Sequence, residues 1–203
     1  IGMTITSCTN DEYVGDSPKT EEALTGAINF GSFSKGMTRA DIVGAEAANL
    51  LGNKFYVTGV KVDGSGSGQS DVFKTYSVVW EANTAGKTES NTSDWEYVGK
   101  AHNFTYSPAI SSQTIKYWDY STTAYDFCAY SIGNGNTLVT SAPGTGQILG
   151  SKIDYSTATT AAYTIQGKRD ELSKCYITDM KTVAKADYGK EVQLQFRSLA
   201  SKV

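Results

Sequence analysis

The strictest constraint on the fold is an alternation of apolar and polar residues near the end of the sequence. Val192-Gln193-Leu194-Gln195-Phe196-Arg197 has an apolar side chain at every second position, and successive side chains of a strand point to opposite faces. This segment therefore predicts a strand with one face on a core. Further runs rich in β-branched and aromatic residues occur at 27–33, 55–62, 72–81, 95–98, 115–120 and 125–131. Their spacing predicts an all-β sandwich or barrel.

The first of these strands and the segment after it have distinct patterns. In 27–33, Ile28, Phe30 and, with a shift of register at the glycine, Phe33 are expected to face the core. Asp41 is a plausible N-cap for one short helix that Gly52 would end. The glycine and serine residues of 63–68 predict a flexible connection between two strands.

Length and charge limit the class of protein. The chain has 203 residues with 39% hydrophobic content, enough for one domain with a sizeable core. A net charge of −3 provides no basic patch for a phosphate backbone, which argues against nucleic acid as a partner. No apolar run approaches the roughly 20 residues of a membrane span, so any attachment to a membrane would have to be covalent.

The start of the sequence suggests such an attachment. Ile5-Thr6-Ser7-Cys8 is an aliphatic residue, two small residues and a cysteine, followed by polar and acidic residues. The pattern resembles the cleavage and lipid-modification site of bacterial lipoproteins, with Cys8 as the lipidated residue. We therefore expect residues 1–7 to be the remnant of a signal peptide and residues 8–24 to form a flexible tether.

Catalytic and metal-binding motifs are weak. His102 is the only histidine and has no paired carboxylate or nucleophile elbow nearby. One histidine and three scattered cysteines do not make a zinc site, and the glycine-rich run 144–150 lacks the spacing of a dinucleotide loop. We predict no catalytic residues, no metal and no cofactor.

Two groups of residues leave alternatives open. If Cys8 carries lipid, Cys128 and Cys175 are either bridged or two separate thiols, and we prefer separate thiols because spacing does not establish the close approach a bridge needs. Aromatic residues either stack on a sugar ring or fill the core, and for most of them we prefer the core because each tryptophan lies in or beside a run that predicts a strand. The candidates for stacking are Trp95, Tyr117, Trp118 and Tyr120.

Taken together, several segments resemble the fimbrillin-like surface lipoproteins of Bacteroidetes. The segments are 28–31, 38–40, 43–50, 55–59, 115–120, 125–130, 169–172 and 192–203, and the likeness spans residues 8–203 in order. The resemblance implies a transthyretin-like antiparallel β-sandwich with one short helix over residues 25–203. Relatives continue beyond the equivalent of Val203 into a C-terminal domain with a donor strand, so the chain is expected to be a truncated form that lacks this domain.

The resemblance also implies a function. Relatives are pilus subunits, anchors and tip adhesins that reach the outer membrane as lipoproteins and are cut after an arginine, so that a strand of another subunit fills the vacated groove. In this chain Arg39 follows the first strand, and a cut there would remove both Cys8 and the strand that carries Ile28, Phe30 and Phe33. The implied partners are other pilus subunits and, through the lipid, the outer membrane.

The alternative is a surface lipoprotein that binds glycans or another host ligand and never polymerises. It would retain its first strand and expose aromatic side chains. In neither case do we expect enzymatic activity.

Overall fold

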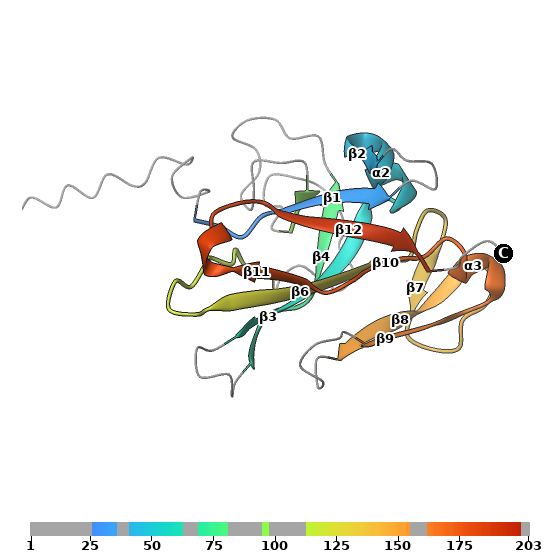
Figure 1. Ribbon diagram of the computed structural model, residues 1–203. Helices are drawn as coiled ribbons and strands as arrows, with labels where there is room; N and C mark the ends of the chain where they lie inside the picture. Colours follow the sequence, from blue (N-terminus) through green and yellow to red (C-terminus); the bar gives the residue numbers. More distant parts are fainter. Residues whose placement is uncertain are drawn as a thin grey trace, which may run out of the picture.

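The computed structural model describes residues 26–35, 41–62, 69–80, 95–97, 113–154 and 162–199 (Figure 1). Most of these residues lie in β-strands and the helices are short, which confirms the predicted all-β class. The predicted lipidation site Cys8, the tether, Arg39, the connection 63–68 and His102 lie outside the described residues.

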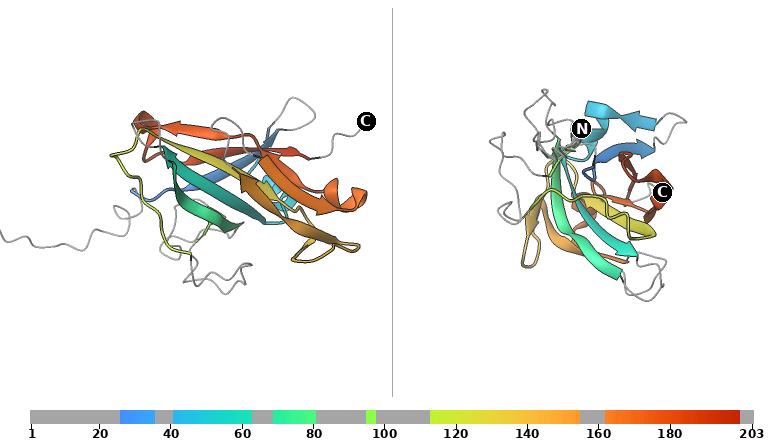
Figure 2. Two further views of the ribbon diagram at one scale, coloured as in Figure 1. Left: turned by 90° about the horizontal axis from the view of Figure 1, so that it is seen from below. Right: turned by 90° about the vertical axis from the view of Figure 1, so that its left-hand side faces the viewer.

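One large sheet organises the fold. Its strands follow the order β2 (Asp41–Val43), β1 (Phe30–Lys35), β12 (Val192–Ser198), β10 (Tyr176–Thr178), β6 (Ala124–Ser131), β3 (Lys54–Val62), β4 (Gln69–Trp80) and β5 (Trp95–Glu96). β11 (Lys181–Ala184) also pairs with β6, beside β10. The sheet curves round a common core (Figure 2), and residues just before β1 bond to the segment 116–118 and to Tyr97, which follows β5.

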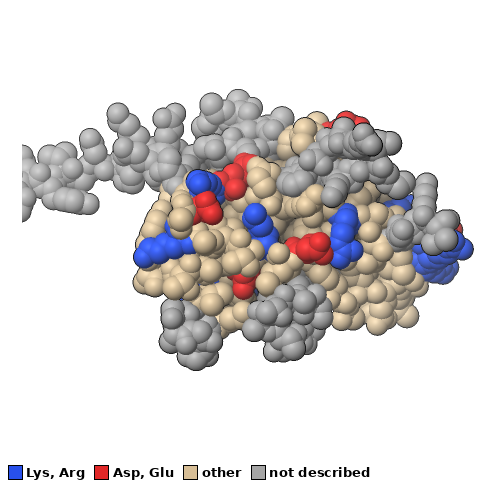
Figure 3. Space-filling view, viewed as in Figure 1, with Lys and Arg blue, Asp and Glu red and all other residues tan. Residues whose placement is uncertain are grey.

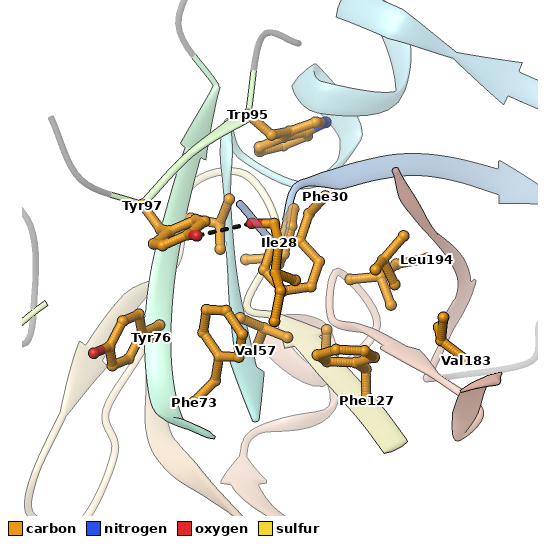
Figure 4. Packing of buried hydrophobic residues seen from close by; sticks show 14 of the residues in the cluster. Ile28, Phe30, Val57, Phe73, Tyr76, Trp95, Tyr97, Phe127, Val183 and Leu194 are labelled. Atoms are coloured by element: carbon orange, nitrogen blue, oxygen red, sulfur yellow. Dashed lines mark hydrogen bonds between the residues drawn. The ribbon is translucent and has the colours of Figure 1, made fainter. Parts of the chain in front are cut away.

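The core inside this curved sheet is aromatic. The alternation of side chains along each strand places every second residue in this core. In β12, Val192, Leu194 and Phe196 are buried while the intervening residues are exposed, as the sequence predicts. Phe30 of β1, Phe55 of β3, Phe73 of β4 and Phe127 of β6 are completely buried. Figure 4 shows the side chains of Phe30, Phe73 and Phe127 pointing into the same core.

The pairing of β3 with β4 is irregular at Gly59, where two of these rings lie close to the backbone. The β3–β4 pairing shifts register on both sides of Gly59. A Cβ at Gly59 would lie 2.7 Å from Cδ1 of Phe127 and 3.1 Å from Cδ2 of Phe73. Glycine at this position therefore allows the backbone to approach the two rings closely.

A smaller sheet covers part of the outer face of the large one. It consists of β7 (Thr137–Val139), β8 (Gln147–Asp154) and β9 (Ala162–Gly167), with α3 (Arg169–Leu172) beside it. Tyr163 and Ile165 of β9 pack against a second cluster formed by Tyr56, Tyr130 and Ile177. Glu171 in α3 accepts a 2.8 Å hydrogen bond from the amide of Gly146, which ties the helix to the loop before β8.

Two strand pairs are parallel within the otherwise antiparallel arrangement. β1 pairs in parallel with β12, and β7 pairs in parallel with β8. The β1–β12 pairing is continuous from Phe30 to Ser34, so the expected shift at Gly31 does not occur. The remaining pairs of the two sheets are antiparallel.

Two local predictions also need correction. The short helix is α2 (Gly44–Leu50), preceded by Val43, and Asp41 is not its N-cap because Asp41 pairs with Lys35 in the sheet. Gly52, with φ +65°, follows the end of the helix as predicted. The run 115–120 is not a regular strand, because it makes a single bridge, between Tyr117 and Ala27.

Candidate strand-exchange site

The first strand and the residues just before it lie between two partners. On one side, the amide of Ile28 donates to the carbonyl of Lys116 at 2.7 Å, and the amide of Trp118 donates to the carbonyl of Gly26 at 3.2 Å. The hydroxyl of Tyr97 adds a 2.8 Å bond to the carbonyl of Ile28 (Figure 4). Sequence patterns marked 95–98 as a strand but gave no sign that this hydroxyl would hold the first strand.

On the other side the partner is β12. Phe30 lies opposite Val192 and Ser34 opposite Phe196, and the amide of Val192 donates to the carbonyl of Asn29 at 2.8 Å. Removing the segment 26–35 would therefore leave two rows of backbone groups without partners, and such edges readily accept another strand.

The sequence predicts three core-facing side chains in this segment, and the structure confirms two of them. Ile28 and Phe30 have no exposed surface. The ring of Phe30 lies edge-on to four others, with centroid distances of 5.2 Å to Phe73, 5.6 Å to Phe127, 6.0 Å to Tyr97 and 6.3 Å to Phe55. Each buried apolar side chain of this size contributes about 1.5–3 kcal/mol by burial, so loss of the segment would open an apolar groove in the centre of the core.

The third residue, Phe33, lies in β1 opposite Gln195, and its side chain lies outside the described part of the structure. β2 pairs only with β1 among the described strands. Loss of β1 would therefore also leave β2 without a sheet partner.

The predicted ligand-stacking residues fall into two classes. Trp95 and Trp118 are 2% and 6% exposed, so the prediction that they stack on a ligand is wrong for this structure. Trp118 stacks instead on Tyr188 at 4.6 Å, and Trp95 packs against Phe55 at 4.8 Å. Tyr117 and Tyr120 are 54% and 55% exposed and retain accessible rings.

Cys128 and Cys175 are buried and are not joined by a disulfide, as expected. Burial raises the pKa of the Cys175 thiol to about 11. Among the described residues, no group of three or more acidic, histidine or cysteine side chains could hold a metal ion. No described helix has the length and hydropathy of a membrane span.

No protein-family model, curated protein or solved structure matches the chain. Any function assigned to it therefore rests on the sequence pattern and on the geometry around β1.

Proposed function

We propose that the protein is a structural and adhesive cell-surface lipoprotein, either a fimbrial subunit or a pilus-associated protein that is assembled by protease-triggered strand exchange. The observation that supports this most directly is the position of β1. It comes early in the chain, fills the centre of the core with Phe30, and bonds to neighbours on both edges.

The processing site in this proposal is Arg39, between the end of β1 at Lys35 and the start of β2 at Asp41. A cut after Arg39 separates the segment with Cys8 and β1 from the rest of the chain. Release from the outer membrane and opening of the acceptor groove are then consequences of one cleavage. A strand from another subunit fills the groove and moves the protein from the membrane into a fimbrium.

The test is limited digestion of the full chain with an arginine-specific protease, followed by intact mass and size-exclusion analysis. We expect a first cut after Arg39, because Arg169 and Arg197 lie within α3 and β12. The cut protein should form oligomers with a longer version that carries the C-terminal donor strand, while the Arg39→Ala variant stays intact and monomeric. An Arg169→Ala variant is the matched control and should behave as the unmodified chain.

A competition experiment tests the groove itself. A labelled synthetic peptide of residues 26–39 should bind the cut protein, not the uncut one, and should suppress oligomer growth. The same peptide with Phe30→Asp should do neither, because a carboxylate cannot enter the ring of aromatic side chains without a large desolvation cost. Normal cutting and assembly of the Arg39→Ala variant, or equal binding of the two peptides, would refute the proposal.

The second candidate function is a surface lipoprotein that binds glycans and retains β1. The exposed rings of Tyr117 and Tyr120 favour it, since accessible aromatic faces stack on sugar rings. A glycan screen with the unmodified chain and with Tyr117→Ala and Tyr120→Ala variants tests it. Binding that either variant abolishes, in a chain that resists cleavage and stays monomeric, would favour this function over assembly.

A further inference from the structure

Part of the edge of β4 is covered by a side chain instead of a strand. β5 pairs with β4 at Val79 and Trp80. Just beyond this pairing, the carboxamide of Gln113 accepts a 2.8 Å hydrogen bond from the amide of Ser77 and donates a 3.0 Å bond to the carbonyl of Ser77. One side chain thus takes the place of a peptide group in a neighbouring strand and covers an edge that would otherwise be open.

The same carboxamide also binds the residue that follows β5. Its Nε2 donates a 2.8 Å bond to the carbonyl of Tyr97. Gln113 is 8% exposed, so water competes little for these bonds, and buried hydrogen bonds of this kind restrain both partners. β4 and β5 pair with each other, and neither pairs with β1 among the described strands. The anchor of Gln113 therefore does not involve the first strand.

This carboxamide begins the segment 113–118, which we call the strap. Two further bonds attach the strap to the same part of the sheet. The amide of Thr114 donates to the hydroxyl of Tyr76 at 3.4 Å, and the amide of Lys116 donates to the hydroxyl of Tyr97 at 3.2 Å. Neither bond involves residues 26–35, so both can persist when the first strand leaves.

The other end of the strap faces the first strand. The carbonyl of Lys116 accepts a bond from the amide of Ile28, and the amide of Trp118 donates to the carbonyl of Gly26. The ring of Trp118 stacks on Tyr188 at 4.6 Å. The strap is thus held at both ends by residues outside the first strand, and it presents one acceptor and one donor to whatever strand lies in the groove.

Charge gives little guidance to a strand that approaches beside β12. Basic and acidic side chains are interspersed on the face that carries β11 and β12 (Figure 3). Arg197 pairs there with Asp179, and Lys190 pairs with Asp187. Interspersed charges of both signs do not favour one sign of partner. Recognition of a strand in the groove therefore depends on its apolar side chains and on the backbone groups of β12 and of the strap.

We propose that Gln113 is a positioning residue for strand exchange, which holds the strap as a preformed wall of the groove after β1 has left. The inference rests on the function proposed above and names the residue that prepares the groove for its partner. The carbonyl of Lys116 accepts a hydrogen bond from the incoming strand, at the position of the Ile28 amide. A wall that is already ordered lowers the entropy cost of binding that strand.

The first test uses the full, uncut chain and does not depend on strand exchange. Gln113→Met retains most of the side-chain volume and removes the bonds to Ser77 and Tyr97. In hydrogen exchange followed by NMR, the amides of Lys116 and Trp118 should exchange at least about tenfold faster, and that of Val192 less than about twofold faster. Equal acceleration of all three amides would show a purely structural role and would overturn the proposal.

A second variant covers the case in which Gln113→Met does not fold. Gln113→Asn retains a carboxamide but is one methylene group shorter, so it cannot bond to β4 and to the residue after β5 together. It should show the same selective acceleration at Lys116 and Trp118. Unchanged exchange at these two amides in a folded Gln113→Asn chain would overturn the proposal.

The final test measures the wall in the cut protein. The full chain cut after Arg39, with its N-terminal fragment still bound, is titrated with a labelled peptide of residues 26–39 and with the same peptide N-methylated at Ile28. The methylated peptide lacks the donor to Lys116 and should enter about tenfold more weakly in the unmodified chain. In Gln113→Met the two peptides should differ by about threefold or less, because a displaced wall offers no fixed acceptor.

Asn136→Leu is the matched control. Asn136 is also a carboxamide that joins two segments, since it donates to the carbonyls of Ile132 and Glu171 at 2.8 Å and 2.9 Å, near the smaller sheet. This variant should retain the full difference between the two peptides. An equal difference in the unmodified and Gln113→Met chains would overturn this inference alone. If neither peptide enters the cut, unmodified chain, strand exchange itself is refuted together with the role of Gln113 in it.

Discussion

The hydroxyl of Tyr97 donates a 2.8 Å hydrogen bond to the main-chain carbonyl of Ile28, which joins the residue after β5 to the residues before β1. The same oxygen accepts a 3.2 Å bond from the amide of Lys116. Burial raises the pKa of this hydroxyl well above its usual range, so it remains protonated and able to donate. One side chain thus holds the first strand and its neighbouring segment together.

Replacing Tyr97 by phenylalanine should destabilise the protein by about 1–3 kcal/mol, the cost of leaving buried backbone groups without a partner. The aromatic packing against Phe30 and Phe73 would be retained. Urea denaturation followed by circular dichroism gives the free energy of unfolding. A Tyr120→Phe variant is the control, and an equal loss in both variants would contradict this role for the Tyr97 hydroxyl.

Phe30 is the side chain on which the core most depends. Phe30→Ala should lower the free energy of unfolding by about 3–5 kcal/mol, because it leaves a cavity among four rings. Phe30→Leu should cost less, since it fills more of the space. Tyr117→Ala, at an exposed position, should change stability by about 0.5 kcal/mol or less. A similar loss for Tyr117→Ala and Phe30→Ala in thermal unfolding would show that Phe30 is not central.

At Gly59 a larger side chain, and not a smaller one, should destabilise the core. Gly59→Ala should cost about 1–3 kcal/mol, because the new methyl group would meet Phe127 and Phe73. Gly150→Ala provides the matched control, since its Cβ would lie 3.7 Å from Leu138, an ordinary contact. Denaturation midpoints of the two variants should therefore differ, and equal midpoints would argue against close packing around Gly59.

The sequence predicted individual strands better than their pairing. Alternation in β12 and the β-branched and aromatic runs of β3, β4 and β6 are local signals, and the structure has strands at these positions. The parallel pairing of β1 with β12 joins segments from opposite ends of the described chain, and no local pattern encodes such a partner. Asp41 shows the same limit, because sheet pairing with Lys35 overrides its preference for a helix N-cap.

Only part of the candidate site was predictable. Ile28 and Phe30 alternate in an apolar run, which indicates a buried face, and both are buried. The strand-like runs around Trp95 and Trp118 favoured the core for both, and both are buried. They remained candidates for stacking because an aromatic residue in a strand has the same local pattern on either face. The break in pairing beside β12, which pairs with β10 and not with β11 among the described strands, is a property of the assembled sheet.

The buried cysteines predict insensitivity to reducing agents. Cys128 and Cys175 form no disulfide, so a reductant should leave the thermal midpoint of a Cys8→Ser chain unchanged. Because burial raises the pKa of Cys175 to about 11, native labelling with iodoacetamide near neutral pH should be slow and should become fast on unfolding. Rapid native labelling, detected by mass spectrometry, would contradict the buried placement of the thiols.

The buried tyrosines predict loss of stability at high pH. Burial raises the pKa of Tyr56 to about 12 from an ordinary value of 10.0, and burial also raises those of Tyr97 and Tyr163. Between pH 10.0 and about pH 12 the Tyr56 hydroxyl is ionised in the unfolded chain and protonated in the folded protein. The free energy of unfolding is therefore unchanged below about pH 10 and falls above it. Urea titrations from about pH 8 to about pH 11 should show this decline.

Tyr56→Phe separates the effect of one hydroxyl from that of general alkaline unfolding. The phenyl ring retains the stacking on Tyr130, whose ring centroid is 4.9 Å away, and the substitution removes a group that the unfolded chain would ionise. The decline between about pH 10 and about pH 11 should therefore be shallower than in the unmodified chain. Tyr120→Phe, at an exposed position, should leave the slope unchanged. Identical slopes for Tyr56→Phe and the unmodified chain would show that Tyr56 does not contribute to the alkaline transition.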